Sequence, residues 1–193
     1  MIENWFATPI YNKVLSRVEM ESVQLSIGKI IEHLDFRKVP GWGSHNHSVS
    51  DPTFSENLFD LYDLSGVEQV IVRSVNEYIN SFDYDKSFDI TIKESWLTDT
   101  NKGEYTVPHN HGGFDISGVY YFLTNSNDGD INFVNPSPVL QTSKFISNSQ
   151  YIKYKPKAGK LLLFPSWLTH FVNENETDSR RISLSFNIKL KEA

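Results

Sequence analysis

The spacing of apolar residues changes near residue 86, and this change limits the folds open to the chain. In residues 20–34 and 65–82 the apolar side chains recur every three to four positions, which predicts two amphipathic helices. From Phe88 onward apolar and polar residues alternate, which predicts strands. Seven or eight short strands between turn signals predict a β-sandwich or jelly roll, with the helices packed on one of its sheets in a single α+β domain.

The predicted strands lie between clusters of turn-forming residues. They cover residues 88–92, 104–109, 115–124, 129–134, 150–155, 160–164, 169–172 and 181–190. The intervening segment between the two helices, "VPGWGSHNHSVSDPTF", is rich in Gly, Ser, Asn and Pro and is predicted to be an irregular loop.

Composition excludes several classes of protein. The chain contains no cysteine, so any metal must bind through nitrogen or oxygen. Its net charge of -6, without a long basic run, argues against a nucleic-acid partner. No stretch approaches the ~20 apolar residues that a membrane span needs, and the first twenty residues lack a signal-peptide pattern. We therefore expect a soluble, cytoplasmic protein.

The segment "TVPHNHGGFDISGVYYF", residues 106–122, contains two of the six histidines. In a strand, residues two apart project to the same face, so His109 and His111 can point into one volume. His170, in "GKLLLFPSWLTHFVNE", follows an apolar strand and could supply a third ligand from a neighbouring strand. Such a set would hold a metal ion with open coordination positions.

Most isolated histidines are structural or solvated, and the other three have simpler explanations. The other "HNH", at His45 and His47, lies in the irregular loop and is interpreted as a surface feature or part of a lid over the substrate. His33 lies beside the apolar face of the first predicted helix. The histidines at 109 and 111 differ because they have a strand context and a third partner.

The last predicted strand, "RRISLSFNIKL", alternates cleanly. Ile182, Leu184, Phe186 and Ile188 share the apolar face, and Arg181, Ser183, Ser185 and Asn187 share the polar one. If the polar face lines a cavity, Arg181 can present a bidentate fork to a carboxylate. The alternative is a solvated outer face.

In their order and spacing, "HNH", "YYF", "GKLLLFPSWLTH" and "RRISLSFN" resemble the iron(II)- and 2-oxoglutarate-dependent oxygenases, in particular a small branch of bacteria and bacteriophages. The opening "WFATPIY" and the segment "SWLTDTNKGEYTVPHNH" are similar to the same branch. The resemblance covers most of residues 1–193. It implies a mainly β, α+β fold: a double-stranded β-helix, a jelly roll like that of the cupins, with its core at about 86–191 and helical support from about 1–85.

The resemblance also assigns roles. It implies that His109 and His170 bind the metal and that His111 stands where the family usually has a carboxylate; Asp115 is the runner-up ligand, with a strand-entry or capping role as its alternative. Arg181 resembles the arginine that binds the distal carboxylate of oxoglutarate, with Ser183 as a second donor. Tyr121 resembles the tyrosine that often contacts that carboxylate, and Tyr120 stays open as the alternative. Trp96 and Asn187 are candidates for the substrate side.

The implied activity is a dioxygenase that converts oxoglutarate to succinate and CO₂ and hydroxylates a C–H bond, with Fe(II), 2-oxoglutarate and O₂. The primary substrate, a peptide side chain or a small metabolite, is left open. Residues 40–54 and 135–150 are candidate lids. The implied location is the bacterial cytoplasm, or the host cytoplasm for a phage protein, and both monomer and homodimer stay open. The competing hypotheses are a cupin-like metal protein that does not use oxoglutarate and a non-catalytic structural or virion protein.

Overall fold

The computed structural model describes residues 7–38, 48–49, 57–82, 86–137 and 150–193 of the chain. Its helices are α1 (Arg17–Ile31), α2 (Leu58–Leu61) and α3 (Ser65–Asn80). Its strands are β1 (Tyr11–Val14), β2 (Arg37–Lys38), β3 (Ser48–Val49), β4 (Phe88–Thr100), β5 (Thr106–His109), β6 (Ile116–Leu123), β7 (Ile131–Val134), β8 (Tyr151–Tyr154), β9 (Lys160–Pro165), β10 (His170–Val172) and β11 (Arg181–Glu192). Within these ranges no helix combines the length and apolar character needed to cross a bilayer.

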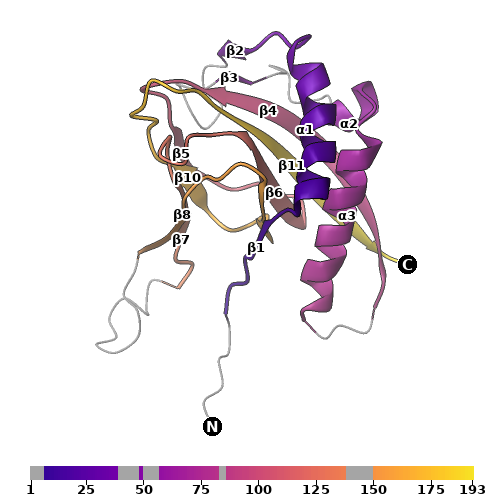
Figure 1. Cartoon of the computed structure of the whole chain (residues 1–193). Helices are drawn as coiled ribbons and strands as arrows, with labels where there is room; N and C mark the ends of the chain where they lie inside the picture. The colour runs from indigo at the N-terminus through magenta and orange to yellow at the C-terminus, as the bar shows by residue number, and fades with distance from the viewer. Residues whose placement is uncertain (1–6, 39–47, 50–56, 83–85, 138–149) are drawn as a thin grey trace.

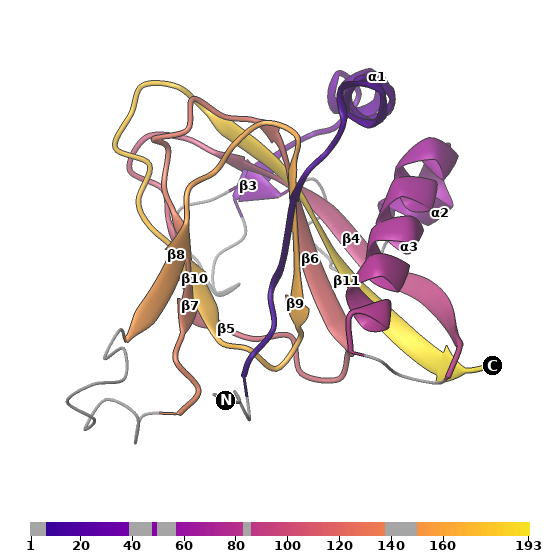
Figure 2. The same cartoon turned by 60° about the horizontal axis from the view of Figure 1, so that its bottom comes forward.

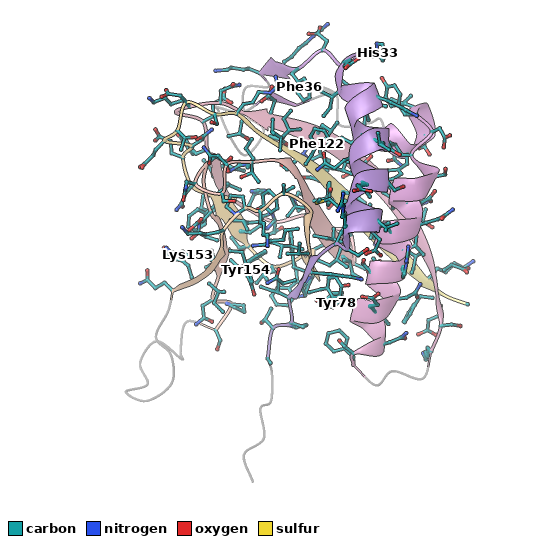
Figure 3. The ribbon with its side chains drawn as sticks, viewed as in Figure 1. His33, Phe36, Tyr78, Phe122, Lys153 and Tyr154 are labelled. Atoms are coloured by element: carbon teal, nitrogen blue, oxygen red, sulfur yellow. The ribbon has the colours of Figure 1, made fainter. Side chains whose placement is uncertain are left out.

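Two helices cover one face of the larger sheet, as Figures 1 and 2 show. α1 begins at Ser16, whose side chain accepts a hydrogen bond from the backbone of Glu19 while the Glu19 side chain accepts one from the backbone of Ser16. α3 carries Tyr78, labelled in Figure 3, whose hydroxyl donates to the carbonyl of Pro9 at 3.0 Å. Both helices bury their predicted apolar faces: Val23, Ile27 and Ile30 in α1, and Val67, Val70, Ile71, Val75 and Tyr78 in α3.

The strands form two facing antiparallel sheets. The larger sheet has the order β1-β9-β6-β11-β4-β3-β2, and the smaller one has the order β5-β10-β7-β8. In Figure 2 the layers follow one another as helices, larger sheet and smaller sheet. The larger sheet is therefore covered on both faces, which explains why β9 reads as a continuous apolar run, "LLLF".

Strand alternation divides the interior into two clusters. On β9, Leu161 and Leu163 pack toward the helices, whereas Leu162 and Phe164 pack between the sheets. On β11, the predicted apolar face of Ile182, Leu184, Phe186 and Ile188 belongs to the helix-side cluster. The polar face of β11 is thereby turned toward the space between the sheets, which is where the candidate site lies.

The predicted architecture is confirmed, with differences at the ends of elements. α1 ends at Ile31 rather than at Leu34, so His33 lies beyond the helix in a turn, where it is exposed (Figure 3). β4 extends to Thr100, well past the predicted strand, because its later residues pair with β11 over the whole of that strand. β1, β2, β3 and α2 were not predicted. The candidate lids fall largely outside the described residues, including Trp42, His45 and His47.

Candidate functional site

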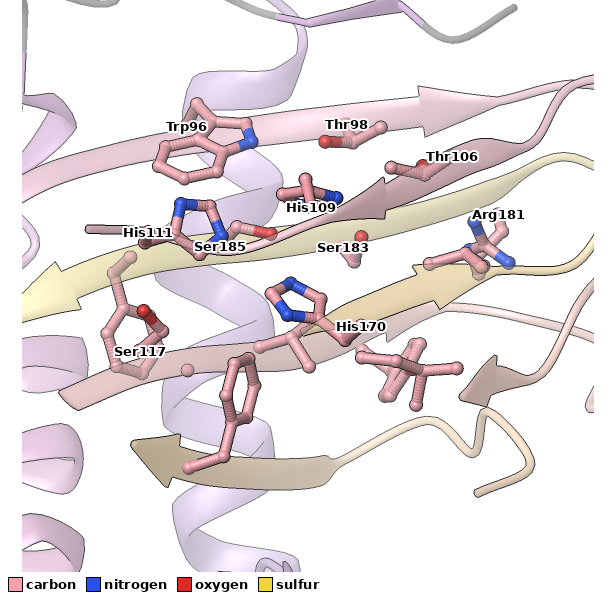
Figure 4. A pocket seen from close by; sticks show the side chains of 17 residues that line it. Trp96, Thr98, Thr106, His109, His111, Ser117, His170, Arg181, Ser183 and Ser185 are labelled. Carbon is pink, nitrogen blue, oxygen red and sulfur yellow. The ribbon is translucent and has the colours of Figure 1, made fainter. Parts of the chain in front are cut away.

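Three histidines converge in a pocket between the two sheets. β5 and β10 pair antiparallel with His109 opposite His170, so both imidazoles project from adjacent strands. His111 lies two residues past the end of β5, and its backbone N–H donates to the carbonyl of Ser166 at 2.9 Å. One ligand atom from each histidine lies within 4.8 Å of the other two (Figure 4). That spacing suits three ligands around one metal ion.

The rings of His109 and His170 are oriented by the same kind of hydrogen bond. In each, Nδ1 lies 2.9 Å from the carbonyl oxygen two residues earlier, that of Val107 for His109 and that of Leu168 for His170. A carbonyl oxygen can only accept, so Nδ1 carries the proton and Nε2 is left as the unprotonated nitrogen. Both rings are therefore set in the tautomer that binds a metal through Nε2.

Burial keeps the cluster neutral. It lowers the pKa of His111 to about 4, with a smaller contribution from His109, and it lowers the pKa of His109. The pKa of His170 falls to about 3, first through burial and then through the neighbouring His109. A metal ligand must be the neutral imidazole, and all three rings are neutral at neutral pH.

The ring of His111 is held differently. Its Nδ1 lies 3.5 Å from Nδ2 of Asn187, a buried residue of β11. Asn187 Nδ2 donates to Oε2 of Glu94 at 2.9 Å, and its Oδ1 accepts from the Ser117 hydroxyl at 2.8 Å. Ser117 in turn lies 2.8 Å from the Ser166 hydroxyl. A side-chain network therefore replaces the backbone carbonyl that orients the other two rings.

Arg181 lies at the other end of the pocket, as Figure 4 shows, and is 3% exposed. Its Nη1 donates to the carbonyls of Asp128 and Gly129, at 2.6 and 3.0 Å, and its Nη2 donates to the Thr100 hydroxyl at 3.1 Å. Burial lowers its pKa, but a guanidinium stays charged in proteins. Among the described residues it forms no ion pair, and two of its five N–H donors are left for a ligand.

The turn that holds Arg181 depends on Gly129. This residue has a φ of +103°, and a Cβ there would lie 2.3 Å from the carbonyl oxygen of Asn173 and 2.9 Å from Nη1 of Arg181. Asp128 stabilises the same turn, because its buried carboxylate accepts hydrogen bonds from the Thr124 hydroxyl and from the backbone N–H of Asn125. The guanidinium is thus held by backbone carbonyls rather than by a carboxylate.

The polar groups beside Arg181 point to an anionic ligand. Tyr121 and Ser183 line the same pocket as Arg181, and the Tyr121 hydroxyl is close enough to interact electrostatically with the guanidinium. Burial raises the pKa of Tyr121, so its hydroxyl stays protonated and can donate. A buried cation with two neighbouring hydroxyl groups is a receptor for a carboxylate.

The structure places the alternative site residues in different surroundings. Tyr120 faces the helices, where Gln24 approaches its hydroxyl at 3.4 Å, so Tyr121 is the tyrosine of the pocket. Asp115 is outside the histidine cluster, and its carboxylate accepts from the backbone of Leu190 at 2.9 Å. It lies directly before β6, at the entry of that strand. Arg180 points away from the pocket and pairs with Asp99 at 3.3 Å.

Some residues of the site were predicted from the sequence and others were not. Trp96 and Asn187 were singled out, and both adjoin His111, Trp96 with its ring centroid 5.8 Å from that of the imidazole. Ser117 was detectable, since it shares a strand face with Val119 and Tyr121. Glu94, Ser166 and Gly129 carried no sequence signal, because their roles depend on contacts with residues far along the chain.

The arrangement fits a metal ion chelated by a dicarboxylate. Three neutral imidazoles on one side of an ion leave positions free for a bidentate ligand and for O₂. The guanidinium of Arg181 and the hydroxyl groups of Tyr121 and Ser183 line the same pocket and can bind the far carboxylate of such a ligand. Both ends of 2-oxoglutarate therefore find matching chemistry.

Comparisons with known proteins agree with this geometry. Residues 94–187, which include all these groups, match the model of a family described as "Putative 2OG-Fe(II) oxygenase". No curated protein sequence matches the chain.

Solved structures share the fold at low sequence identity. The alpha ketoglutarate-dependent epimerase SnoN from nogalamycin biosynthesis is 13% identical, with a TM-score of 0.65 over 94% of this chain and 76% of that one. A Pseudomonas putida prolyl-4-hydroxylase is 14% identical, with a TM-score of 0.58 over 94% and 92%. HygX from Streptomyces hygroscopicus, solved with nickel and 2-oxoglutarate, is 13% identical, with a TM-score of 0.60 over 94% and 83%. These likenesses confirm the double-stranded β-helix fold. The family match shows that residues 94–187, which hold the candidate site, are similar to the putative 2OG-Fe(II) oxygenases.

Proposed function

We propose that the chain is an Fe(II)- and 2-oxoglutarate-dependent dioxygenase, and specifically a hydroxylase, with residues 1–193 acting as one oxygenase domain. His109, His111 and His170 are the proposed metal ligands. The observation that carries the proposal is Arg181, a buried guanidinium without an ion pair among the described residues, in the same pocket as three convergent neutral imidazoles. A buried charge without an ion pair is costly, so it favours a ligand of opposite charge.

Binding of oxoglutarate divides into two contacts. His109, His111 and His170 would hold the metal that binds one end of oxoglutarate, and the distal carboxylate would accept from Arg181, Tyr121 and Ser183. The carbonyls of Asp128 and Gly129 fix the guanidinium before the ligand arrives, so little orientational freedom is lost on binding. Arg181 thereby selects a dicarboxylate of the right length.

The reaction also needs a dry and rigid site. The metal, when bound, supplies the activation of O₂ and the oxidative decarboxylation that drive the chemistry. The protein residues hold oxoglutarate, and the buried walls formed by Phe164, Val119 and Ile131 exclude water from the pocket. Trp96 lies against His111 and is the proposed contact on the substrate side.

A three-histidine site has an electrostatic consequence. Neutral His111 stands where the family usually has a carboxylate, so the metal carries one more unit of net positive charge. Added positive charge strengthens attraction for the oxoglutarate dianion. Tight co-substrate binding is therefore expected of this site.

The substrate proposal stays at the level of class. The structural neighbours include the P. putida prolyl-4-hydroxylase and HygX with hygromycin B bound, so peptide and small-molecule substrates both occur on this fold. We propose a peptide side chain or a small metabolite, hydroxylated at a C–H bond, in a bacterial or bacteriophage-infected cytoplasm.

The test is anaerobic addition of Fe(II) and oxoglutarate to the protein, with detection of the weak visible absorption band of the chelate. Arg181→Ala should lose the band at low oxoglutarate concentration, and His109→Ala should lose it at all concentrations. Arg180→Ala is the matched control, because the side chain of Arg180 forms an ion pair with Asp99 and does not line the pocket. Asp115→Ala should keep the band.

The outcomes separate the competing functions. Metal binding without the band, equally in wild type and Arg181→Ala, would support a cupin-like protein that does not use oxoglutarate. Absence of metal binding, with no increase in Tm on adding metal and oxoglutarate together, would support a non-catalytic role. Turnover of oxoglutarate to succinate, lost in His170→Ala, would support the dioxygenase.

A further inference from the structure

His111 is the one ring of the cluster that the backbone does not orient. His109 and His170 each donate from Nδ1 to a carbonyl oxygen, which fixes the tautomer. Nδ1 of His111 instead faces the Asn187 carboxamide at 3.5 Å, a long contact. A carboxamide differs from a carbonyl because it can present either an acceptor oxygen or a donor nitrogen.

The direction of that carboxamide decides whether His111 can bind a metal through Nε2. With Nδ2 of Asn187 toward the ring, Nδ1 must accept, so the imidazole proton sits on Nε2 and blocks the ligand position. With Oδ1 toward the ring, Nδ1 donates and Nε2 is free, as in the other two histidines. The orientation in the structure, with Nδ2 nearest the ring, is therefore the one that does not favour a metal.

The neighbours of Asn187 show what holds this orientation. The Ser117–Ser166 hydroxyl pair accommodates both directions, because each hydroxyl can donate or accept. Glu94 does not, because an ionised carboxylate only accepts. Its Oε2 receives the hydrogen bond of Asn187 Nδ2 at 2.9 Å and so favours Nδ2 on the side that also faces His111.

We infer that Asn187 is the positioning residue for His111, that it acts by turning its carboxamide oxygen toward Nδ1–H, and that Glu94 opposes this turn. The inference rests on the proposed metal role of the three histidines. Asn187 does not touch the metal or oxoglutarate in this scheme. Glu94 therefore opposes metal binding by His111, the third ligand. For His111 to bind the metal, the hydrogen bond that Asn187 donates to Glu94 must be broken.

The test measures Co(II) affinity of the whole chain by visible absorption, without turnover. Glu94→Gln should tighten Co(II) binding about three- to tenfold, because a glutamine amide can donate to the turned carboxamide oxygen. Asn187→Leu should weaken binding roughly 10- to 100-fold. Asp89→Asn, which removes an exposed carboxylate from the same strand, is the charge-matched control and should leave the affinity unchanged.

Two further measurements guard against a purely structural effect. Asn187→Asp in the Glu94→Gln background presents only acceptor oxygens to His111, so it should bind Co(II) at least as tightly as Glu94→Gln alone. The Co(II) complex should also show slowly exchanging imidazole N–H signals in its paramagnetically shifted proton spectrum. The signal of His111 should be lost in Asn187→Leu while those of His109 and His170 remain.

The inference fails if Glu94→Gln weakens Co(II) binding or leaves it unchanged, or if the His111 signal persists in Asn187→Leu. If wild type binds Co(II) and His109→Ala abolishes binding while neither Glu94→Gln nor Asn187→Leu alters it, the proposed metal centre stands and only this inference is overturned. A folded wild type that binds no Co(II) would overturn both.

Discussion

Gly129→Ala is expected to weaken oxoglutarate binding without removing any group that touches oxoglutarate. The substitution places a side chain at a φ of +103°, a strained conformation that costs about 1–3 kcal/mol. Its Cβ would lie 2.3 Å from the Asn173 carbonyl oxygen, where backbone cannot yield cheaply, and 2.9 Å from Nη1 of Arg181. The turn must shift, and Arg181 must move with it.

The magnitude follows from the hydrogen bonds at risk. Arg181 donates to the carbonyl of Gly129 itself, and a hydrogen bond to a charged group contributes about 1.5–3 kcal/mol. If that amount is lost from the preorganisation of the guanidinium, the Kd for oxoglutarate should rise at least about tenfold. The stability of the fold should fall by the strain term as well.

The assay is anaerobic calorimetric titration of the metal-loaded protein with oxoglutarate, beside urea unfolding. Gly103→Ala is the matched control: its φ is +81°, and its Cβ would have only a side-chain atom of Glu174 within 4 Å, at 4.0 Å. It should lose stability but keep its oxoglutarate affinity. An unchanged Kd in Gly129→Ala, or an equal rise in Gly103→Ala, would refute the view that this turn positions Arg181.

Three other outcomes are expected. Because burial lowers the pKa of His111 to about 4 and that of His170 to about 3, Co(II) binding should persist down to about pH 5, whereas ordinary imidazoles with a pKa near 6.5 would lose the metal earlier; a decline near pH 6.5 in a pH titration would contradict this. Gly118→Ala, whose Cβ would lie 2.3 Å from the Phe186 ring, should reduce the free energy of unfolding by about 1–3 kcal/mol in urea, and no loss would contradict the packing argument. Ser16→Ala removes the cap of α1 and should cost about 1 kcal/mol in the same assay with unchanged oxoglutarate affinity; a change in that affinity would show that α1 is coupled to the site.

The fold was largely predictable because its elements are amphipathic. Helix and strand periodicities record which side chains face the core, and the larger sheet with two covering helices follows from them. The short elements were not predicted, because so few residues show no clear helix or strand periodicity. β1 contains four residues and depends on pairing with β9, so its local sequence carries little information about the contact.

What the sequence by itself determined are the chemical groups and the faces they share: two histidines two apart, a third on a distant strand, and Arg181 on the polar face of β11. The register that sets His109 opposite His170 was decided only by the tertiary structure. The same holds for the choice of Tyr121 over Tyr120, the hydrogen bond of Asp115 to Leu190, and the network from Glu94 through Asn187 to His111. Alternation along one strand is a local property, whereas the direction of a carboxamide depends on groups about seventy to ninety positions apart that meet only once the sheets have formed.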